Sequence, residues 1–500
     1  MKAQLEYSGD LKNDLLELNR IDSVDWEFMA YIDETWKPHN IAILQQFLTD
    51  DRHLVIISDC DADGLSALGV SLTYLSYAWR EKSYSTIILG RSDRNPEAII
   101  NSYKNDAPNF LLLDCGTNLN IENIQVDPTS ILVIDHHEPK NTEYQYHVIN
   151  PKLYKVEHDE EVLSGAGLTY SCFSSLVGHS ITAIQYAAIG TVADVVPMLH
   201  RNRWIVAQGI LACNTAPLRL VEIFLKKFGK PITESDIAFY VAPAINAASR
   251  MNQIEIAKLG YVDNDSIAAQ QLVELNAKRK ESTEGISRNA KITELDKCVI
   301  IEINDGSEHA IASLVGNKLF GSTGKPTMSI IEREDHCTIS LRTGTTLDAA
   351  LFLFSLKLVT SGGHFGAAGG TVDKERKSEV IERFISYCNE FAILHQEYDA
   401  DIKISPGKIY DAAEQMIDLA PFGNSFRKPM FLSKMKLIYA FRFPPGGKHI
   451  KAKFISNNYE FNAVLYNFES NLSIGKYFDI VYEISYNKQG QLELIVREIE

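Results

Sequence analysis

The sequence predicts an α/β protein: a domain with a mostly parallel sheet, a second α/β domain joined to it by a long helix, and a C-terminal β-barrel. Between residues 52 and 200, short apolar runs alternate with segments of helical spacing, which is typical of a parallel sheet covered by helices. A second alternation runs from 298 to 390, and short β-like runs follow residue 399. We place the domains at 1–50 (N-terminal helical cap), 51–252, 253–297 (connecting helix), 298–394 and 395–500.

The bulk composition excludes several classes of protein. The chain has 500 residues, and no apolar run reaches the roughly 20 residues of a membrane span. The N-terminus lacks the apolar core of a signal peptide, and the seven dispersed cysteines predict reduced thiols. A net charge of −16 argues against a nonspecific nucleic-acid coat protein, but it is compatible with an enzyme whose acids bind cations. We therefore expect a cytoplasmic monomer without membrane contact.

The first fifty residues have helical spacing at Leu11, Leu15 and Leu18, and again around Trp26. We expect them to cap the first domain. The apolar runs 54–57, 110–113 and 131–134 are then expected to be buried strands. They lead into a set of acids and imidazoles: Asp59, Asp61, Asp63, Asp114, Asp135, His136 and His137.

A further acid, Asp194, stands in the later segment 190–197. Strand ends in an open α/β sheet are where ligands bind, so we expect these groups to meet there. Carboxylates brought together repel, and they take up protons unless a cation is present. Carboxylates with imidazole suit Mn²⁺ or Mg²⁺, with Zn²⁺ or Fe²⁺ as alternatives. The number of ligands suffices for two ions sharing one bridging Asp, a known arrangement for attack on phosphorus.

The chain between the acids and the second domain offers weaker signals. The turn 164–167 of small residues is either a phosphate-binding turn or a site of close helix packing, and packing is the better interpretation. Asn246 and Arg250 lie one helical turn apart and project from one face. An Arg beside a metal site clamps phosphate oxygens well. From 263 to 294 the spacing predicts a long connecting helix.

In the second domain, the runs 299–303, 326–331 and 338–342 are expected to be strands. The glycine-rich segment 361–370, which contains Gly363 and His364, predicts a turn whose exposed amides hold an anion. With Ser340 and Arg342 on a nearby strand, it makes a candidate phosphate clamp.

The last hundred residues contain five short β-like runs, which favour a small barrel such as an OB-fold. Basic and aromatic residues interleave there, as a surface that binds single strands requires. The basic ones are Lys434, Lys436, Arg442, Lys448, His449, Lys451 and Lys453, and the aromatic ones are Tyr439, Phe441, Phe443 and Phe454. Barrel-core rings with solvated lysines are the alternative interpretation.

These motifs resemble those of the DHH phosphoesterase family. Asp-Cys-Asp61-Ala-Asp63-Gly is similar to its first motif, Leu-Leu-Leu-Asp114 to its second, Asp135-His136-His137 to its third and Gly-Thr-Val-Ala-Asp194 to its fourth. Within the family, RecJ-like exonucleases are the most similar branch. Their motifs are matched by 245–251, by Ser340-Leu-Arg342, by Gly363-His364, by 420–423 and by Gly-Gly-Lys448-His449. Cys115 and Ser249 depart from the usual residues of that branch.

The resemblance implies a role for each residue. Asp61, Asp63, Asp114, His136 and Asp194 would bind metal, with Asp59 as a further candidate ligand and Asp114 as the bridge. His137 would contact the scissile phosphate or assist proton transfer, so His137, Asp114 and Arg250 are the expected catalytic residues. Asp135 would orient a metal ligand by a hydrogen bond without binding the metal itself. Asn246, Arg250, Ser340, Arg342, Gly363, His364, Lys448 and His449 would hold nucleic-acid phosphates.

The function implied is a 5′→3′ exonuclease that uses two divalent cations, Mn²⁺ or Mg²⁺, to degrade single-stranded DNA to mononucleotides in recombination or repair. Its second domain would be DHHA1-like. A single-strand-binding protein or a helicase are candidate partners. The alternatives are a phosphoesterase for short oligonucleotides or small nucleotides, against which the C-terminal barrel argues, and an inactive replication scaffold, against which the full set of acids and histidines argues.

Overall fold

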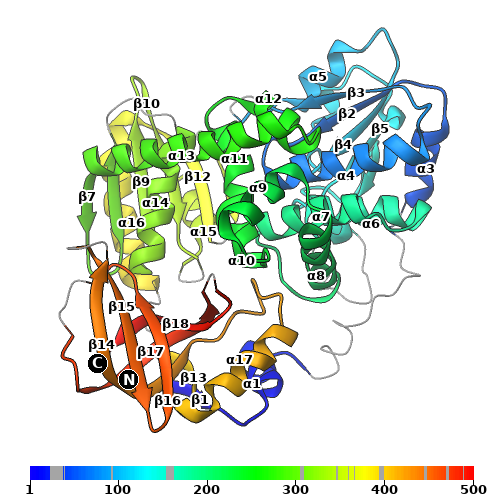
Figure 1. The fold of residues 1–500 in the computed structure, drawn as a ribbon. Coiled ribbons are helices and arrows are strands. Elements are labelled where there is room, and N and C mark those ends of the chain that lie inside the picture. Colours follow the sequence, from blue (N-terminus) through cyan, green and yellow to red (C-terminus); the bar gives the residue numbers. More distant parts are fainter. Residues whose placement is uncertain are drawn as a thin grey trace. The chain divides into compact units, whose positions relative to one another are not determined.

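The computed structural model describes residues 1–500 except 23–37, 39, 92–93, 154–162, 304–308, 345–346, 359, 365, 393–398, 444–446, 469–471 and 488. The chain forms two compact units (Figure 1). Unit 1 comprises Met1–Ser249, Ile254–Leu272 and Tyr398–Glu500, and unit 2 comprises Arg250–Gln253 and Val273–Glu397. The stretch around Trp26 lies outside the described residues.

A five-stranded parallel sheet forms the centre of the first part of unit 1. Its strand order is β3-β2-β4-β5-β6, and every pairing is parallel. The strands are β2 (Leu54–Ser58), β3 (Tyr84–Ile88), β4 (Asn109–Leu113), β5 (Ile131–Ile134) and β6 (His147–Ile149). The three predicted strands are confirmed, and β2, β4 and β5 are buried along their whole length. The strand order reverses between β2 and β4, so a switch point lies at their carboxyl ends.

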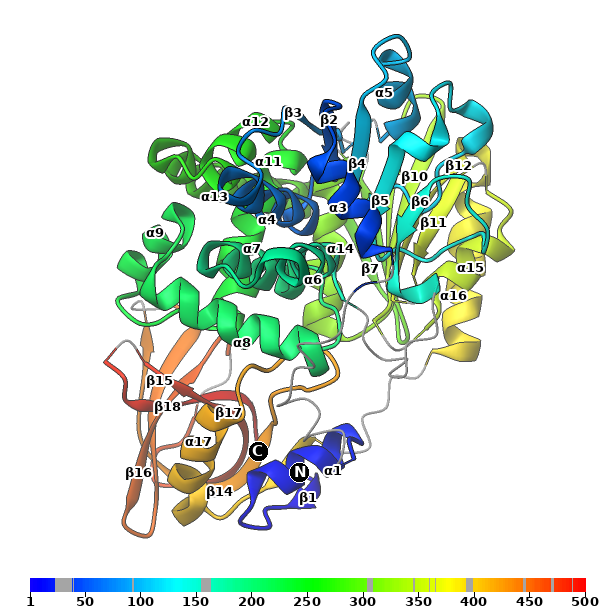
Figure 2. The ribbon, with the colours of Figure 1, turned by 90° about the vertical axis from the view of Figure 1, so that its right-hand side faces the viewer.

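Helices cover both faces of this sheet (Figure 2). Ile100 of α5 (Pro96–Ser102) packs on one face with Val55, Phe110 and Val133. The other face meets α4 (Ala62–Ala78) and α6 (Gly165–Val177). The remaining helices of this part are α3 (Ile41–Thr49), α7 (Ile181–Ala193), α8 (His200–Thr215), α9 (Arg219–Phe228), the short α10 (Glu234–Asp236), α11 (Ala242–Arg250) and α12 (Ile254–Ala257).

The connecting helix α13 (Ser266–Asn289) is shorter than predicted. Residues 291–294, expected to be its last turn, form β7 (Lys291–Glu294), which pairs antiparallel with β8 (Val299–Ile303). Asn289-Ala-Lys is followed by Ile-Thr, and β-branched residues favour a strand once a neighbouring strand offers hydrogen bonds.

Unit 2 is built on a six-stranded mixed sheet of order β11-β12-β10-β9-β8-β7. Its predicted strands are confirmed as β8, β9 (Thr327–Glu332) and β10 (His336–Arg342). The glycine-rich segment, expected to be a turn, is instead an antiparallel hairpin of β11 (Thr360–His364) and β12 (Ala367–Asp373). The helices of this unit are α14 (His309–Thr323), α15 (Ala349–Ser355) and α16 (Lys377–Phe391).

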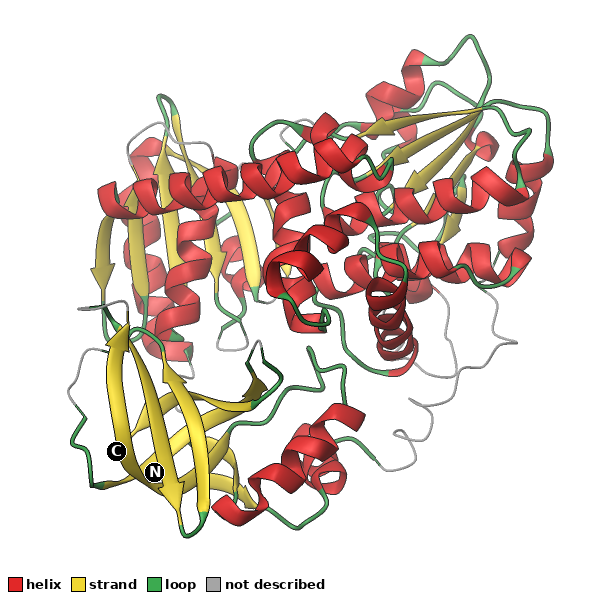
Figure 3. Cartoon of the chain, viewed as in Figure 1, coloured by secondary structure: helices red, strands yellow, loops and turns green. Residues whose placement is uncertain are grey.

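The C-terminal part is a closed barrel, drawn in yellow at the lower left of Figure 3. Its strands are β14 (Phe431–Phe443), β15 (His449–Ser456), β16 (Tyr459–Leu465), β17 (Tyr477–Tyr486) and β18 (Leu492–Ile499). The order β14-β15-β16-β18-β17 closes because β17 also pairs with β14. All five predicted strands are confirmed. Closure leaves no open edge among them.

The N-terminus extends the barrel sheet, although the sequence was expected to cap the first domain. β1 (Ala3–Glu6) pairs in parallel with β13 (Ala400–Lys403), and β13 pairs with β14. α1 (Leu11–Asn19) lies against α17 (Ile409–Asp418). The helical spacing of 11–19 was correct, but spacing alone does not say which core an apolar face joins.

No single helix among the described residues is both long and apolar enough to cross a membrane; only α8 and α9 taken together, bent by 74° at their junction, meet that test.

The packing of α8 on α7 gives a stability prediction. A Cβ added at Gly209 would overlap the side chain of Ala188, so Gly209→Ala should destabilise the protein by about 1–3 kcal/mol. Gly285→Ala in α13 is the control, because nothing lies within 4 Å of an added Cβ, and it should be neutral or stabilising by about 0.4–1 kcal/mol. Thermal unfolding followed by circular dichroism compares the two. Equal melting temperatures would contradict the close approach of α7 and α8.

Candidate metal centre

The predicted acids and histidines gather at the carboxyl ends of the parallel strands. Asp59 follows β2, Asp114 follows β4, and Asp135, His136 and His137 follow β5. Asp194 caps the C-terminus of α7 and joins them through His136. The cluster therefore lies at the switch point between β2 and β4, which is where open α/β sheets bind their ligands.

Helix N-termini hold two of the acids in place. Asp61 is the N-cap of α4, and its carboxylate accepts from the amides of Asp63 and Gly64. The carboxylate of Asp63 accepts from the amides of Gly165 at 2.7 Å and Ala166 at 3.0 Å, which begin α6. Amides at a helix start favour negative charge. Burial nevertheless raises the pKa of Asp63 to about 7.

The small-residue turn before α6 serves close packing, the better of its two interpretations. A Cβ at Gly165 would lie 2.5 Å from Oδ1 of Asp114, and a Cβ at Gly190 would lie 2.5 Å from Oδ1 of Asp63. The amides of this turn go to a carboxylate of the protein itself. The glycines thus let two helices approach the acids closely enough to fix them.

Asp114 is the most constrained member of the cluster. Its backbone is left-handed, with φ of 57°, and the residue is 3% exposed. Its Oδ1 has no hydrogen-bond partner among the described residues. Burial, together with the charges of Asp63 and Asp61, raises the pKa of Asp114 well above its usual value. A buried carboxylate oxygen that accepts no hydrogen bond from the described residues, in a residue surrounded by other acids and by imidazoles, fits a cation ligand.

His136 follows β5 and lies close to three of the acids. Its Nε2 lies 3.3 Å from Oδ1 of Asp114, 3.5 Å from Oδ2 of Asp194 and 3.8 Å from Oδ2 of Asp63. Burial lowers the pKa of His136 to about 4, so the ring is neutral near pH 7 and has a lone pair to offer. Burial also raises the pKa of Asp194 to about 8.

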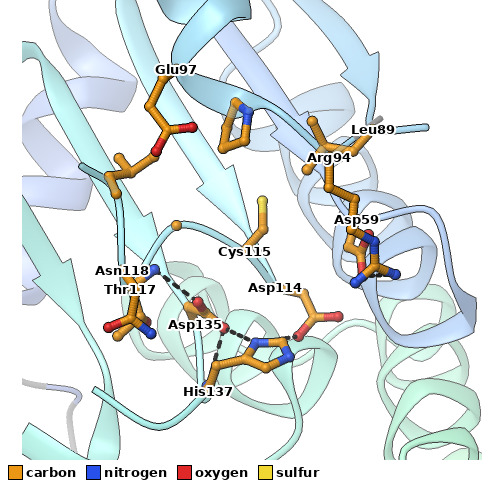
Figure 4. Close-up of a pocket in the computed structure, with 13 residues that line it drawn as sticks. Asp59, Leu89, Arg94, Glu97, Asp114, Cys115, Thr117, Asn118, Asp135 and His137 are labelled. Atoms are coloured by element: carbon orange, nitrogen blue, oxygen red, sulfur yellow. Dashed lines mark hydrogen bonds and ion pairs between the residues drawn. The ribbon is translucent and has the colours of Figure 1, made fainter. Parts of the chain in front are cut away.

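His137 is held by Asp135 (Figure 4). The Nδ1 of His137 lies 2.7 Å from Oδ1 of Asp135, and this hydrogen bond raises the pKa of His137 to about 9. Although burial opposes it, the same bond keeps the pKa of Asp135 below its usual value. Asp135 also accepts from the amides of Thr117 and His136. Its carboxylate is therefore occupied with orienting the histidine segment.

Asp59 differs from the other acids of the cluster because one of its oxygens is paired with an arginine. Oδ1 accepts from the amide of Cys60 at 2.8 Å, and Oδ2 lies 3.0 Å from Nη2 of Arg94. Arg94 was not found from the sequence. It stands just before α5 in a loop with no motif, and only the fold brings it to the end of β2.

The donor atoms fall into three overlapping groups, each with all its atoms within 4.8 Å of one another. The groups are Asp59, Asp61 and Asp114; Asp63, His136 and Asp194; and Asp114, His136 and His137. Asp114 and His136 each belong to two groups. Shared ligands of this kind suit two neighbouring divalent cations, and carboxylate with imidazole suits Mn²⁺ or Mg²⁺.

Asn246 and Arg250 are both on α11, as predicted. Oδ1 of Asn246 accepts from the amide of Ala62 at 2.9 Å and so ties α11 to the start of α4. Arg250 ends α11 and belongs to unit 2. The role of Asn246 visible in the structure is therefore support of the acidic turn, and its predicted phosphate contact stays a prediction.

In unit 2, Ser340 and Arg342 lie on β10, and Arg342 donates to Oγ of Ser340 at 3.1 Å. Nε of Arg342 also donates to Oδ1 of Asn317 on α14, a residue that the sequence did not indicate. Gly363 and His364 belong to β11, which pairs with β12 next to β10. The expected free amides of this segment are partly used in the hairpin, and Gly363, at φ of 140°, is needed because β12 passes so close.

The barrel carries a row of aromatic rings across β14, β15 and the end of β16. Neighbouring ring centroids lie 5.5–6.4 Å apart along this path, which we name the barrel ring row: Tyr439, Phe441, Phe443, His449 and Tyr466. Lys451 lies 5.3 Å from the centroid of Phe443. Lys448 is exposed beside the row.

Two residues of the predicted basic and aromatic surface have other roles. Phe454 is buried in the barrel core. Arg442 is turned to main-chain carbonyls, with Nη1 donating to Phe468 O at 2.7 Å. The β-bulge between Leu437 and Tyr439 changes which residues face outward, and the sequence did not reveal it.

The unpartnered carboxylate predicts how metal affects stability. Without metal, Asp114→Asn should melt at the same or a higher temperature than the unaltered protein, because it removes a buried charge. With Mn²⁺ at roughly 100 times its Kd, the unaltered protein should gain about 3–5 °C, and the variant should lose most of that gain. Asp14→Asn, at a buried acid of α1, is the control and should keep it. A full Mn²⁺ gain in Asp114→Asn would contradict the ligand assignment. Melting with EDTA and with Mn²⁺ gives the answer.

Two family models match the chain. The model described as "DHH family, N-terminal domain" matches residues 53–195, and the one described as "RecJ OB domain" matches residues 399–498. The first covers the parallel sheet with its acids and histidines, and the second covers the barrel.

Several curated relatives carry the name "Single-stranded-DNA-specific exonuclease RecJ". The protein from Thermus thermophilus is 26% identical over 425 residues, which are 78% of this chain and 60% of that protein. The one from Escherichia coli is 22% identical over 456 residues, with 80% of this chain and 78% of that protein covered. The chain thus spans about three fifths of the first relative's length and about four fifths of the second's.

Solved structures agree with these matches in fold. The crystal structure of RecJ from Thermus thermophilus in complex with Mn²⁺ matches 100% of this chain and 78% of that one, with a TM-score of 0.79 and 21% identity. A structure of exonuclease RecJ bound to manganese matches 70% of this chain and 94% of that one, with a TM-score of 0.56 and 24% identity. The chain thus contains a domain of the DHH family at 53–195 and a RecJ OB domain at 399–498, and it is similar to the RecJ proteins in both.

Proposed function

We propose that the chain is a metal-dependent exonuclease that degrades single-stranded DNA from its 5′ end to mononucleotides, in DNA recombination or repair. The observation that carries this proposal is the cluster of Asp114, His136 and their neighbours, in which a buried carboxylate oxygen has no hydrogen-bond partner among the described residues. The name of the relatives, single-stranded-DNA-specific exonuclease, supports the substrate and the exonuclease activity.

The donor set fits two divalent cations, Mn²⁺ or Mg²⁺. Such ions, when bound, lower the pKa of a coordinated water and stabilise charge on phosphate oxygens. Asp61, Asp63, Asp114, His136 and Asp194 would hold them. Asp59, whose oxygens already have partners, is a further candidate.

His137 would present a protonated ring nitrogen to the substrate, because Asp135 fixes the orientation of the ring. Asp135 takes the Nδ1 side of the ring, so Nε2 is left to face the substrate. A ring with a raised pKa carries its proton at neutral pH, so His137 would donate a charged hydrogen bond to a phosphate oxygen or a proton to the leaving 3′ oxygen. The carboxylate of Asp135 stabilises that charge throughout.

The residues of unit 2 would hold the terminal phosphate. Nη1 of Arg342 donates to Oγ of Ser340 at 3.1 Å, and Asn317 orients the guanidinium of Arg342. A planar guanidinium fixed in this way suits phosphate oxygens. Arg250, Gly363 and His364 complete the proposed clamp.

The barrel ring row would bind the remaining nucleotides of the DNA strand. Stacking is tolerant of sequence because every base has a π-face, and nearby lysines attract the backbone. Tyr439 is 53% exposed and Phe441 43%, so both rings are open to bases. Lys451 and Lys448 supply local positive charge on a chain whose net charge is negative, whereas Lys453 is paired with Glu460 at 3.1 Å.

A cytoplasmic location, a monomeric state and contacts with a single-strand-binding protein or a helicase are part of the proposal. The alternative of a phosphoesterase for small nucleotides lacks a use for the barrel ring row. The alternative of an inactive scaffold lacks a use for the buried acids, which repel one another without a cation.

Digestion of end-labelled DNA tests the activity. With Mn²⁺ or Mg²⁺, the protein should convert 5′-phosphorylated single strands to mononucleotides and spare blunt duplex. Asp114→Ala and His136→Ala should each lower the rate by at least a hundredfold, while His336→Ala, at a half-buried histidine of β10, leaves it unchanged. Running RNA beside DNA defines the sugar preference. Activity retained in either cluster variant would refute the two-cation assignment.

A second test addresses the barrel by substitution, because deleting it would also remove the partner of β1. Tyr439→Ala with Phe441→Ala should raise KM about tenfold or more for strands of about 20 nucleotides, from roughly 1–3 kcal/mol per lost stack. Hydrolysis of a trinucleotide should be unaffected. Tyr477→Ala, at a still more exposed ring of β17, is the control. Equal losses on long and short substrates would contradict the proposed strand path.

A further inference from the structure

A pocket of about 300 Å³ opens beside the metal centre, and the roles proposed above do not use it (Figure 4). Asp59, Asp114 and His137 form the wall that it shares with the cluster. The opposite wall comes from the start of α5 and from the loop after β4. A group bound here would therefore be directly attached to, or next to, a phosphate held at the cluster.

The lining of the pocket favours an uncharged flat ring. Leu89, Pro96 and Leu119 give it an apolar side. Its acids are Asp59, Glu97, Asp114 and Asp135, so a second anion would be repelled. The volume is at the lower end of the range for small-molecule sites. A nucleobase, which is planar and neutral, satisfies these three conditions.

The polar groups of the pocket are already engaged. Asn118 donates to the carbonyl of Glu138 and accepts from the amide of Lys140. Thr117 accepts at Oγ1 from Asn150, and Glu97 accepts at Oε1 from the amide of Asn120. Groups engaged in this way do not discriminate among base edges, so the pocket would accept any base.

Arg94 stands at the rim of this pocket. Its Nη2 is held 3.0 Å from Oδ2 of Asp59, and its side chain is still 45% exposed. A guanidinium tied by one edge retains a free planar face, and such faces stack on aromatic rings. Asp59 would thus link Arg94 to the metal centre.

We propose that this pocket is a base-tolerant nucleobase subsite next to the scissile phosphate and that Arg94 stacks on the base. The proposal rests on the proposed nuclease function and deepens it. It assigns Arg94 a binding role, and it gives a reason why Asp59 has a guanidinium as partner.

Abasic substrates test the subsite. Three 5′-phosphorylated strands are compared: one intact, one without the base 5′ of the first scissile phosphate, and one without the base 3′ of it. The unaltered protein should show a KM about tenfold higher for one of the abasic strands, since a stacked base contributes strongly to binding. Arg94→Met should abolish most of this difference. The proposal fails if the unaltered protein treats all three alike, or if Arg94→Met keeps the full difference.

Two further variants separate stacking from the ion pair with Asp59. Arg94→Lys keeps the charge but loses the planar face, so it should lose the abasic discrimination as Arg94→Met does; full discrimination in Arg94→Lys would refute stacking. Arg52→Gln is the matched control, because Arg52 pairs with Asp50 at 3.1 Å and its side chain is also 45% exposed. It precedes β2, at the other end of the strand, and should behave as the unaltered protein does.

A binding measurement keeps the subsite testable if the chain hydrolyses no DNA. Calorimetric titration with Mn²⁺ present compares deoxyadenosine monophosphate with deoxyribose 5-phosphate. Binding of the nucleotide several-fold tighter than that of the sugar phosphate, lost in Arg94→Met and kept in Arg52→Gln, supports the subsite independently of nuclease activity. Equal affinities for the two ligands in the unaltered protein would overturn it.

Discussion

The repulsion among buried carboxylates at the end of the parallel sheet is the constraint on which the rest of unit 1 depends. Asp63 and Asp114 are almost fully buried, and burial raises the pKa of both. Folding has to hold them together before any cation compensates. The chain does so with backbone amides at two helix starts and with one neutral imidazole. Even so, Oδ1 of Asp114 accepts no hydrogen bond from any described residue.

Close backbone approach is the means by which the fold imposes that arrangement. Gly165 brings α6 against Asp114, and Gly190 brings α7 against Asp63. Gly209 allows α8 to pack closely against α7, whose C-cap is Asp194. The position of an acid in the cluster is thus set by glycines on three different helices. Interiors packed at this density transmit small displacements, so ligand geometry and core stability are coupled here.

The sequence predicted what depends on local pattern. Buried parallel strands are continuous apolar runs, so 54–57, 110–113 and 131–134 were visible, as were the acids that follow them. It missed what depends on distant partners. The pairing of β1 with β13 joins residues almost four hundred positions apart, and Arg94 and Asn317 acquire roles only through their neighbours in space. The glycine-rich hairpin was taken for a turn because glycine is compatible with both.

A chain with a net charge of −16 gains little from long-range attraction to DNA, and this bears on how it would select single strands. The barrel ring row and the pocket beside Arg94 both offer flat faces to flat ligands. In a duplex the bases are stacked on one another and paired, so neither surface can reach them. Single-strand selectivity would then follow from the way the strand is held, because binding by stacking excludes any substrate whose bases are already stacked. Local lysines would serve the backbone, while the rings would decide which form of DNA is accepted.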